Sequence, residues 1–266
     1  MSLGEGTLPG IEFAWGTDPG RVRKNNEDSL GGPWLVKPER QAMLSDRGTL
    51  FAVADGMGGH ARGEVASRVA IESLFRSYYG GTGDPALDLR QAVLAANREV
   101  VRAGRPDDAP PDASPERGPT RMGTTLVAIV VHGAQLFVAN VGDSRAYRFR
   151  DGNLAALTRD DSLVAEEVRR GVLSPEEAAN FPYRNILTHA LGSSLELEVP
   201  VDADTFRHGD MILLCSDGLH GPVADEKVAG ILTGARPHDA AKQLVDAANA
   251  AGGPDNVTVV LVAARS

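Results

Sequence analysis

Two segments of this sequence are apolar at nearly every position, and they constrain the fold more than any other feature. They are Leu126–Val131 and Val257–Val262, in which Thr258 is the only polar residue. A β-strand that lacks polar alternation has to be covered on both of its faces. A second sheet can bury one face and helices can bury the other, so the two segments predict stacked sheets between helical layers.

The remaining elements are predicted from apolar runs, helical periodicity and turn residues. Further strands are expected at 51–54, 135–141, 145–150 and 211–215. Helices are expected at 63–79, 84–103, 225–233 and 238–251, with a short helix after the capping box Ser174-Pro175-Glu176-Glu177. The strands between about 125 and 157 are expected to form an antiparallel meander, in which Asp151-Gly152 makes a type I′ turn. This mixed order of strands and helices argues against a doubly wound sheet.

The chain is expected to fold as one domain over residues 11–264. Residues 1–10 lack a basic segment followed by an apolar one, which argues against a signal peptide. We expect these ten residues to be a flexible terminus or residues added for expression. Residues 106–119 are rich in proline and acidic side chains without apolar periodicity, so a mobile loop is expected at about 105–120.

Composition argues against several classes of function. The formal net charge of −9 leaves no general basic surface for nucleic acid. No apolar run approaches the roughly 20 residues needed to cross a bilayer, so no membrane segment is expected. The single cysteine, Cys215, cannot form an internal disulfide and fits a reducing, cytoplasmic setting.

Aspartates recur where the predicted strands end. Asp55, Asp143 and Asp217 each follow an apolar strand and precede a turn residue, and Asp255 lies just before the last strand. Each one alone could be an ordinary turn former. Strand ends meet at one rim of a compact sandwich, where four carboxylates would repel one another unless a cation neutralised them. Oxygen ligands select hard cations such as Mg²⁺ or Mn²⁺, so the four together predict a metal site.

These aspartates lie within a series of motifs along the chain. The motifs are Gly20-Arg-Val-Arg23-Lys-Asn-Asn26-Glu27-Asp28-Ser29, Asp55-Gly-Met-Gly-Gly-His60, Gly123-Thr124-Thr125, Asn140-Val-Gly-Asp143-Ser-Arg145, Leu157-Thr158-Arg-Asp-Asp-Ser162, Ser216-Asp217-Gly218-Leu219 and Gly253-Pro-Asp255-Asn256-Val257-Thr258. In sequence and in order, the series resembles the motifs of the metal-dependent Ser/Thr protein phosphatases (PPM, type 2C) in their bacterial form. The resemblance implies an α+β fold, a four-layer α-β-β-α sandwich of two antiparallel sheets flanked by helices. It also implies a flap insertion beside the active site, at about 160–191.

The resemblance implies a centre of two Mn²⁺ or Mg²⁺ ions. Asp55 would bridge the two ions, and Asp217 and Asp255 would hold the first. The carbonyl of Gly56 and water contacts from Glu27 would serve the second ion. A glycine at position 56 would also allow a tight turn and a close approach of its backbone oxygen.

Three further assignments follow from the same resemblance. Bacterial members often hold a third, weaker ion, to which Asp143 and Asp217 would contribute. Arg23 is the candidate phosphate clamp, because its planar fork can bind two phosphate oxygens at once. Family members of the animal type place a proton-donating His where this chain has Met57, and a thioether cannot donate a proton. The general acid is then His60, a metal-bound water or no side chain at all, and His60 is equally a candidate turn residue.

The function implied is hydrolysis of phosphoserine and phosphothreonine by direct attack of a metal-bridging hydroxide, with phosphorylated proteins and Ser/Thr protein kinases as partners. The alternative is a catalytically inactive, phosphatase-like module that binds phosphoproteins. A cysteine-dependent phosphatase needs Arg six positions after its Cys, whereas Cys215 is followed at that spacing by Gly221. The chain also contains no Gly-Lys pair, which excludes a P-loop.

Overall fold

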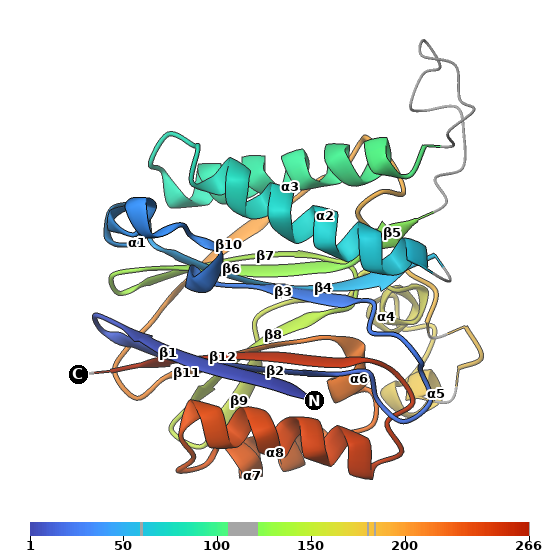
Figure 1. Ribbon diagram of the computed structural model, residues 1–266. Helices are drawn as coiled ribbons and strands as arrows, with labels where there is room; N and C mark the ends of the chain where they lie inside the picture. The colour runs from blue at the N-terminus through green and yellow to red at the C-terminus, as the bar shows by residue number, and fades with distance from the viewer. Residues whose placement is uncertain (59–60, 106–121, 180, 184, 266) are drawn as a thin grey trace.

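Two antiparallel sheets stacked face to face form the centre of the protein, and helices cover both outer faces (Figure 1). The computed structural model describes residues 1–58, 61–105, 122–179, 181–183 and 185–265. The first sheet has the order β1-β2-β12-β11-β8-β9, with strands Ser2–Leu8, Ile11–Asp18, Val257–Ala264, Met211–Cys215, Arg145–Arg150 and Asn153–Ala156. The second has the order β10-β7-β6-β4-β3, with strands Val201–Thr205, Gln135–Val141, Leu126–His132, Thr49–Met57 and Asp28–Gly31, and the short β5 (Gly123–Thr124) pairs with β4.

Long helices form the outer layers. Helices α2 (Ala61–Tyr78) and α3 (Pro85–Ala103) lie over the second sheet, while α7 (Asp225–Leu232) and α8 (Pro237–Ala250) lie over the first (Figure 1). The shorter helices are η1 (Pro33–Leu35), η2 (Pro38–Arg40), α1 (Ala42–Arg47), α4 (Leu163–Arg169), α5 (Pro175–Ala179) and α6 (Asp217–His220). The predicted four-layer α-β-β-α sandwich is therefore confirmed. None of the helices in the described part of the chain has the length and apolar character needed to span a bilayer.

The apolar central strands show why the layers form. In β6, Val127 and Ile129 pack between the two sheets, whereas Ala128 and Val130 pack under the helices of the second sheet. All four side chains are fully buried, and so is Cys215 on β11. Burying an aliphatic side chain of this size stabilises the fold by roughly 1.5–3 kcal/mol, so both faces of the strand contribute.

The expected meander between 125 and 157 is wrong at its centre. Strands β6 and β7 pair with each other, and β8 pairs with β9 through a turn in which Asp151 and Gly152 both have positive φ, as a type I′ turn requires. However, β7 belongs to the second sheet and β8 to the first, so these two strands do not pair with each other. The chain crosses between the sheets at Gly142, whose φ of 102° suits glycine.

The N-terminal segment also departs from expectation. Residues 2–8, which we expected to be flexible, form β1, and every residue of that strand has a partner on β2. Gly4 and Gly6 lie opposite Trp15 and Phe13, and a Cβ atom at either glycine would come within 2.5 Å of the facing ring. Aromatic rings thus pack across the glycines, which replaces the side-chain contacts that β1 lacks. The expected mobile loop at 105–120 falls, apart from Arg105, outside the described residues.

Residues 160–191, expected to be the flap, contain α4 and α5 and, where the structure describes them, no strand longer than an isolated bridge. Helix α5 begins as its sequence predicts. Ser174 Oγ accepts from the Glu177 N–H at 3.2 Å, and the Ser174 N–H donates to Glu177 Oε2 at 2.8 Å, which is a reciprocal capping box. The segment returns to the sandwich where Leu187 bridges to Ser162 and Leu191 to Thr124.

Candidate metal centre

One cavity, of about 450 Å³, contains almost every residue that the sequence singled out. Its lining includes Arg23, Glu27, Asp55, Gly56, Asp143, Asp217 and Asp255. Met57 lies in the same lining, and Asn185 and Leu187 close it from the segment 160–191. His60 lies outside the described residues.

Strand geometry explains why these residues meet. Strand β11 runs antiparallel to β12, so its C-terminal end lies beside the N-terminal end of β12. Asp217 follows the first of these ends as the opening residue of α6, and Asp255 precedes the second. On the other sheet, Asp55 lies near the end of β4, and Asp143 follows the end of β7. The four aspartates therefore converge from both sheets, as the strand-end pattern predicted.

Asn256 fixes the loop that carries Arg23 and Glu27. Its Oδ1 accepts from the Glu27 N–H at 2.7 Å, and its Nδ2 donates to the carbonyls of Asn25 at 2.8 Å and Pro19 at 3.0 Å. A buried amide that uses both of its ends in this way holds the backbone in one place. The loop is thereby tied to the residue that follows Asp255.

Two glycines of the motifs allow close backbone approaches at the cavity. A Cβ atom at Gly56 would lie 2.1 Å from the carbonyl oxygen of Gly63, and one at Gly218 would lie 1.8 Å from that of Asn256. No side chain fits at either distance. The glycine requirement here is steric, because neither residue has a positive φ.

The carboxyl groups in the cavity repel one another and are withdrawn from water. Burial is the largest cause that raises the pKa of Asp55, followed by the charge of Asp28. Burial and then Asp255 raise the pKa of Asp217, while burial and then Asp217 raise the pKa of Asp143 to about 7. Such a cluster binds protons, or a cation in their place.

Asp28 is a member of the cluster to which the sequence analysis gave no role. It lies opposite Asp55 in the pairing of β3 with β4, and Ser216 Oγ donates to its Oδ2 at 2.8 Å. Burial raises its pKa to about 7. Its position in the motif Asn26-Glu27-Asp28 was visible in the sequence, but its pairing with Asp55 was not.

The chemistry of the donor set fits a hard cation. Asp28 Oδ1 and Asp217 Oδ1 are buried and have no hydrogen-bond partner, although each is a strong acceptor. A divalent cation would satisfy such oxygens and offset the repulsion between their charges. As they stand, no three His, Cys, Asp or Glu side chains within the described residues are arranged to hold an ion, so the carboxylates surround the cavity without closing on one point.

One reason for this open arrangement is an ion pair inside the site. Arg23 Nη2 lies 2.6 Å from Asp255 Oδ2, and the two side chains are 58% and 33% exposed. The hydrogen bond to Asp255 raises the pKa of the Arg23 guanidinium. Arg23, the predicted phosphate clamp, is thus paired with Asp255, a predicted metal ligand. A cation at Asp255 would compete with Arg23 for that carboxylate.

A larger hollow, of about 900 Å³, is lined by residues of β7, β10 and the segment 160–191. Side chains of both signs line it, among them Arg159, Arg169, Glu198 and Asp202. Among its described lining residues, Asp161 is the one carboxyl whose pKa is raised, chiefly by burial, so no cluster of such groups forms there. Size alone therefore does not identify the chemical site, and the smaller cavity is the stronger candidate.

Comparison with known proteins agrees with this assignment. The family model described as "Protein phosphatase 2C" matches residues 26–250. The serine/threonine protein phosphatase PstP of Mycobacterium tuberculosis is 40% identical over 254 residues, which cover 94% of this chain and 44% of PstP, so the chain spans less than half of that relative. The serine/threonine phosphatase stp of Listeria monocytogenes is 38% identical over 92% of this chain and 93% of its own length.

A solved structure extends the likeness to three dimensions. The catalytic domain of PstP, crystallised in complex with two manganese ions, superposes with a TM-score of 0.78 at 36% identity. The match covers 96% of this chain and 99% of that one. Motifs, sheet order and overall superposition agree, and the chain belongs to the protein phosphatase 2C family.

Proposed function

We propose that this chain is a metal-dependent phosphoprotein phosphatase that hydrolyses phosphoserine and phosphothreonine. The observation that carries the proposal is the cavity in which Asp55, Asp217 and Asp255 converge beside Arg23. Raised carboxyl pKa values and buried acceptors without donors favour a divalent cation there. Family membership supports the same chemistry, and the related PstP domain was crystallised with two manganese ions.

Each ligand has a proposed place. Asp55 would bridge two ions, Asp217 and Asp255 would hold the first, the Gly56 carbonyl and Glu27 (through water) would serve the second, and Asp143 with Asp217 would serve a third, weaker one. When bound, Mn²⁺ or Mg²⁺ would lower the pKa of a coordinated water, so that hydroxide is available for direct attack on phosphorus, and would withdraw charge from the phosphoryl oxygens. The acidic side chains contribute by holding positive charge at the point where the substrate's negative charge arrives.

Arg23 binds and orients the phosphate. Its guanidinium reaches the cavity from an exposed loop and can offer two parallel N–H donors to two phosphoryl oxygens. The Arg23 N–H groups become available to phosphate when the guanidinium no longer pairs with Asp255. Met57 lines the cavity but cannot protonate the leaving alkoxide, so that proton comes from His60 or from water. Phosphorylated proteins are the expected substrates, and Ser/Thr protein kinases are the expected source of those substrates.

Hydrolysis of a phosphothreonine peptide with and without Mn²⁺ tests the proposal. The wild-type protein should turn over the peptide with Mn²⁺ and lose that turnover when EDTA removes the ion. Asp55→Asn should lower kcat/KM on the order of 10³-fold, since it removes a charge at the centre of the site. Asp46→Asn is the matched control, because Asp46 is an exposed carboxylate on α1.

The outcomes separate the two functions considered. Turnover that survives EDTA, or near-normal turnover by Asp55→Asn, would refute a metal-dependent phosphatase. Tight binding of the phosphopeptide without any turnover in Mn²⁺ would instead indicate an inactive binding module.

A further inference from the structure

The loop that carries Asp143 is held on two sides. This crossover loop, residues 142–144, takes the chain from the second sheet to the first. On one side it contacts Asp161, whose N–H donates to the Gly142 carbonyl at 2.9 Å and whose Oδ2 accepts from the Gly142 N–H at 3.1 Å. These contacts fix the backbone at Gly142 and leave the Asp143 carbonyl to a different partner.

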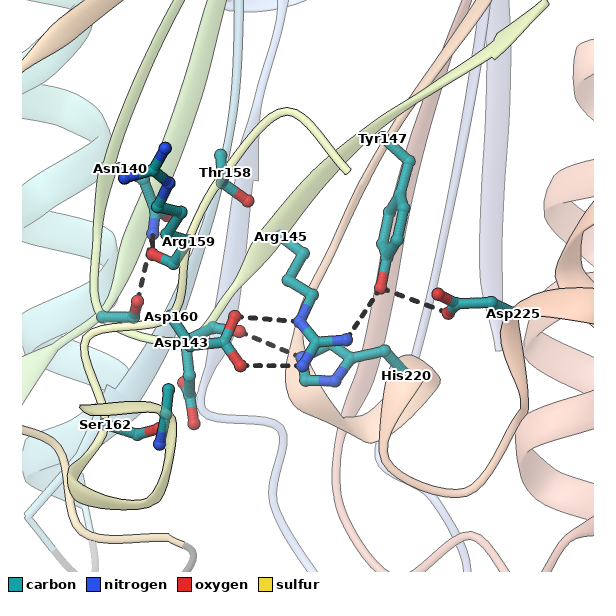
Figure 2. Close-up of polar contacts among 12 residues, drawn as sticks. Asn140, Asp143, Arg145, Tyr147, Thr158, Arg159, Asp160, Ser162, His220 and Asp225 are labelled. Carbon is teal, nitrogen blue, oxygen red and sulfur yellow. Dashed lines mark hydrogen bonds and ion pairs between the residues drawn. The ribbon is translucent and has the colours of Figure 1, made fainter. Parts of the chain in front are cut away.

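That partner is His220. Its Nε2 lies 3.0 Å from the Asp143 carbonyl oxygen (Figure 2). A carbonyl only accepts hydrogen bonds, so Nε2 carries the hydrogen and donates it. Burial, followed by the charge of Arg145, lowers the pKa of His220 to about 4, so the ring is neutral near pH 7. His220 therefore contributes a directed hydrogen bond rather than a charge.

The hydrogen bond links the helix that begins at Asp217 to the backbone of Asp143, and these two aspartates are the proposed ligands of the third ion. Helix α6 has four residues, begins at Asp217 and ends at His220. Residues three apart in a helix lie on neighbouring parts of one face, so His220 is fixed relative to Asp217. The carboxylates of Asp143 and Asp217 line the same cavity and repel each other when both are charged. The hydrogen bond from His220 opposes the separation that this repulsion favours.

Neighbouring side chains hold the surroundings of the ring in place. Arg145 donates to Asp160 through Nε at 2.9 Å and Nη2 at 2.7 Å, and its Nη1 donates to the Tyr147 hydroxyl at 2.9 Å. Figure 2 shows this network beside His220, where it links β8 to the start of the segment 160–191. A bidentate guanidinium of this kind has little freedom to move, so the His220 ring has a rigid neighbour.

We propose that His220 is a positioning residue that sets the separation between Asp143 and Asp217 and thereby the affinity for the third, weaker cation. The inference rests on the proposed function, because that function supplies the cation. His220 does not line the cavity, so it acts on the ion only through Asp143. Partners that orient a metal ligand in this way typically change metal affinity 10- to 100-fold when they are removed.

Calorimetric titration of Mn²⁺ into the metal-free protein tests the inference, and circular dichroism confirms that each variant is folded. His220→Phe keeps a ring but lacks the donor, so it should weaken the weakest Mn²⁺ site 10- to 100-fold and leave the two tight sites within about twofold. His220→Gln retains an N–H donor and should restore most of the weak binding. His208→Phe, which changes an exposed histidine outside the site, should behave as wild type.

Unchanged weak-site affinity in His220→Phe would overturn the inference, as would equal weakening of every site or a failure of His220→Gln to restore binding. Wild-type protein that binds only two ions would overturn it too, while the proposed function would stand. Wild-type protein that binds no Mn²⁺ would overturn both.

Discussion

Replacing Asp28 with asparagine should stabilise the metal-free protein, and the gain should grow as the pH rises. Asp28 is buried beside Asp55, its partner in the pairing of β3 with β4, and its Oδ1 has no hydrogen-bond partner. Its charged form is therefore costly, and its pKa is raised to about 7 from an ordinary value of 3.8. An asparagine at this position would have nearly the same shape as the aspartate without its charge.

The sign and size of the effect follow from that pKa. Between the unfolded and the folded pKa, the native state keeps a proton that the unfolded chain has lost, so stability falls as the pH rises. Within that window, each unit of pH lowers the free energy of unfolding by about 1.4 kcal/mol for one such group. From pH 5 to pH 7 the total cost is roughly 2 kcal/mol, because Asp28 begins to ionise in the folded state as the pH approaches its pKa of about 7. Above pH 8 the cost should level off.

Thermal unfolding in EDTA at half-unit steps from pH 5 to pH 8.5 measures this effect. The advantage of Asp28→Asn in Tm should widen by roughly 4–8 °C between pH 5 and pH 7.5. Asp246→Asn is the control, because Asp246 is an exposed carboxylate paired with Lys242 on α8 and should give a constant difference. A pH-independent difference for Asp28→Asn, or a Tm lower than wild type throughout, would refute the claim that Asp28 is destabilised by its charge.

Two further substitutions test the geometry of the site. Arg23→Ala should raise KM for a phosphopeptide about 10-fold with a smaller change in kcat, because the guanidinium binds phosphate and does not take part in the attack; an unchanged KM in steady-state assays would exclude the clamp. Gly218→Ala should lower the free energy of unfolding by roughly 2–4 kcal/mol, because its Cβ would lie 1.8 Å from the Asn256 carbonyl; chemical denaturation with a wild-type midpoint would contradict that contact.

The layered fold could be predicted because the burial of a strand is visible in its pattern of apolar residues. Leu126–Val131 has no polar face, which required cover on both sides, and the structure supplies a sheet and a helical layer. The sequence pattern does not show to which of the two sheets a strand belongs. The β6–β7 and β8–β9 pairings are local and were predicted. The crossing from β7 to β8 depends instead on how all the strands are divided between the two sheets. Strand β1 was missed because Gly4 and Gly6 suggest flexibility until Trp15 and Phe13 are placed opposite them.

The candidate site likewise combines features that the local sequence predicts with features that depend on long-range contacts. The four aspartates could be predicted to meet because each one lies where a strand ends. Asp28 could not be predicted to join them, since it begins β3 and reaches the cluster only through its register with Asp55. The bond from His220 to Asp143 and the pairing of Arg23 with Asp255 join residues 77 and 232 positions apart. Contacts of that range are set by the fold as a whole and not by any local pattern.

Under the proposed function, the pairing of Arg23 with Asp255 suggests how an acidic protein would bind a doubly charged phosphate. The two side chains form an ion pair, and burial raises the pKa of Asp143 and of Asp217, which favours their neutral forms. A cation held by Asp255 would supply positive charge to the cavity, and it would leave the Arg23 guanidinium free to bind phosphate. We therefore expect cation binding and substrate binding to be coupled through this single carboxylate.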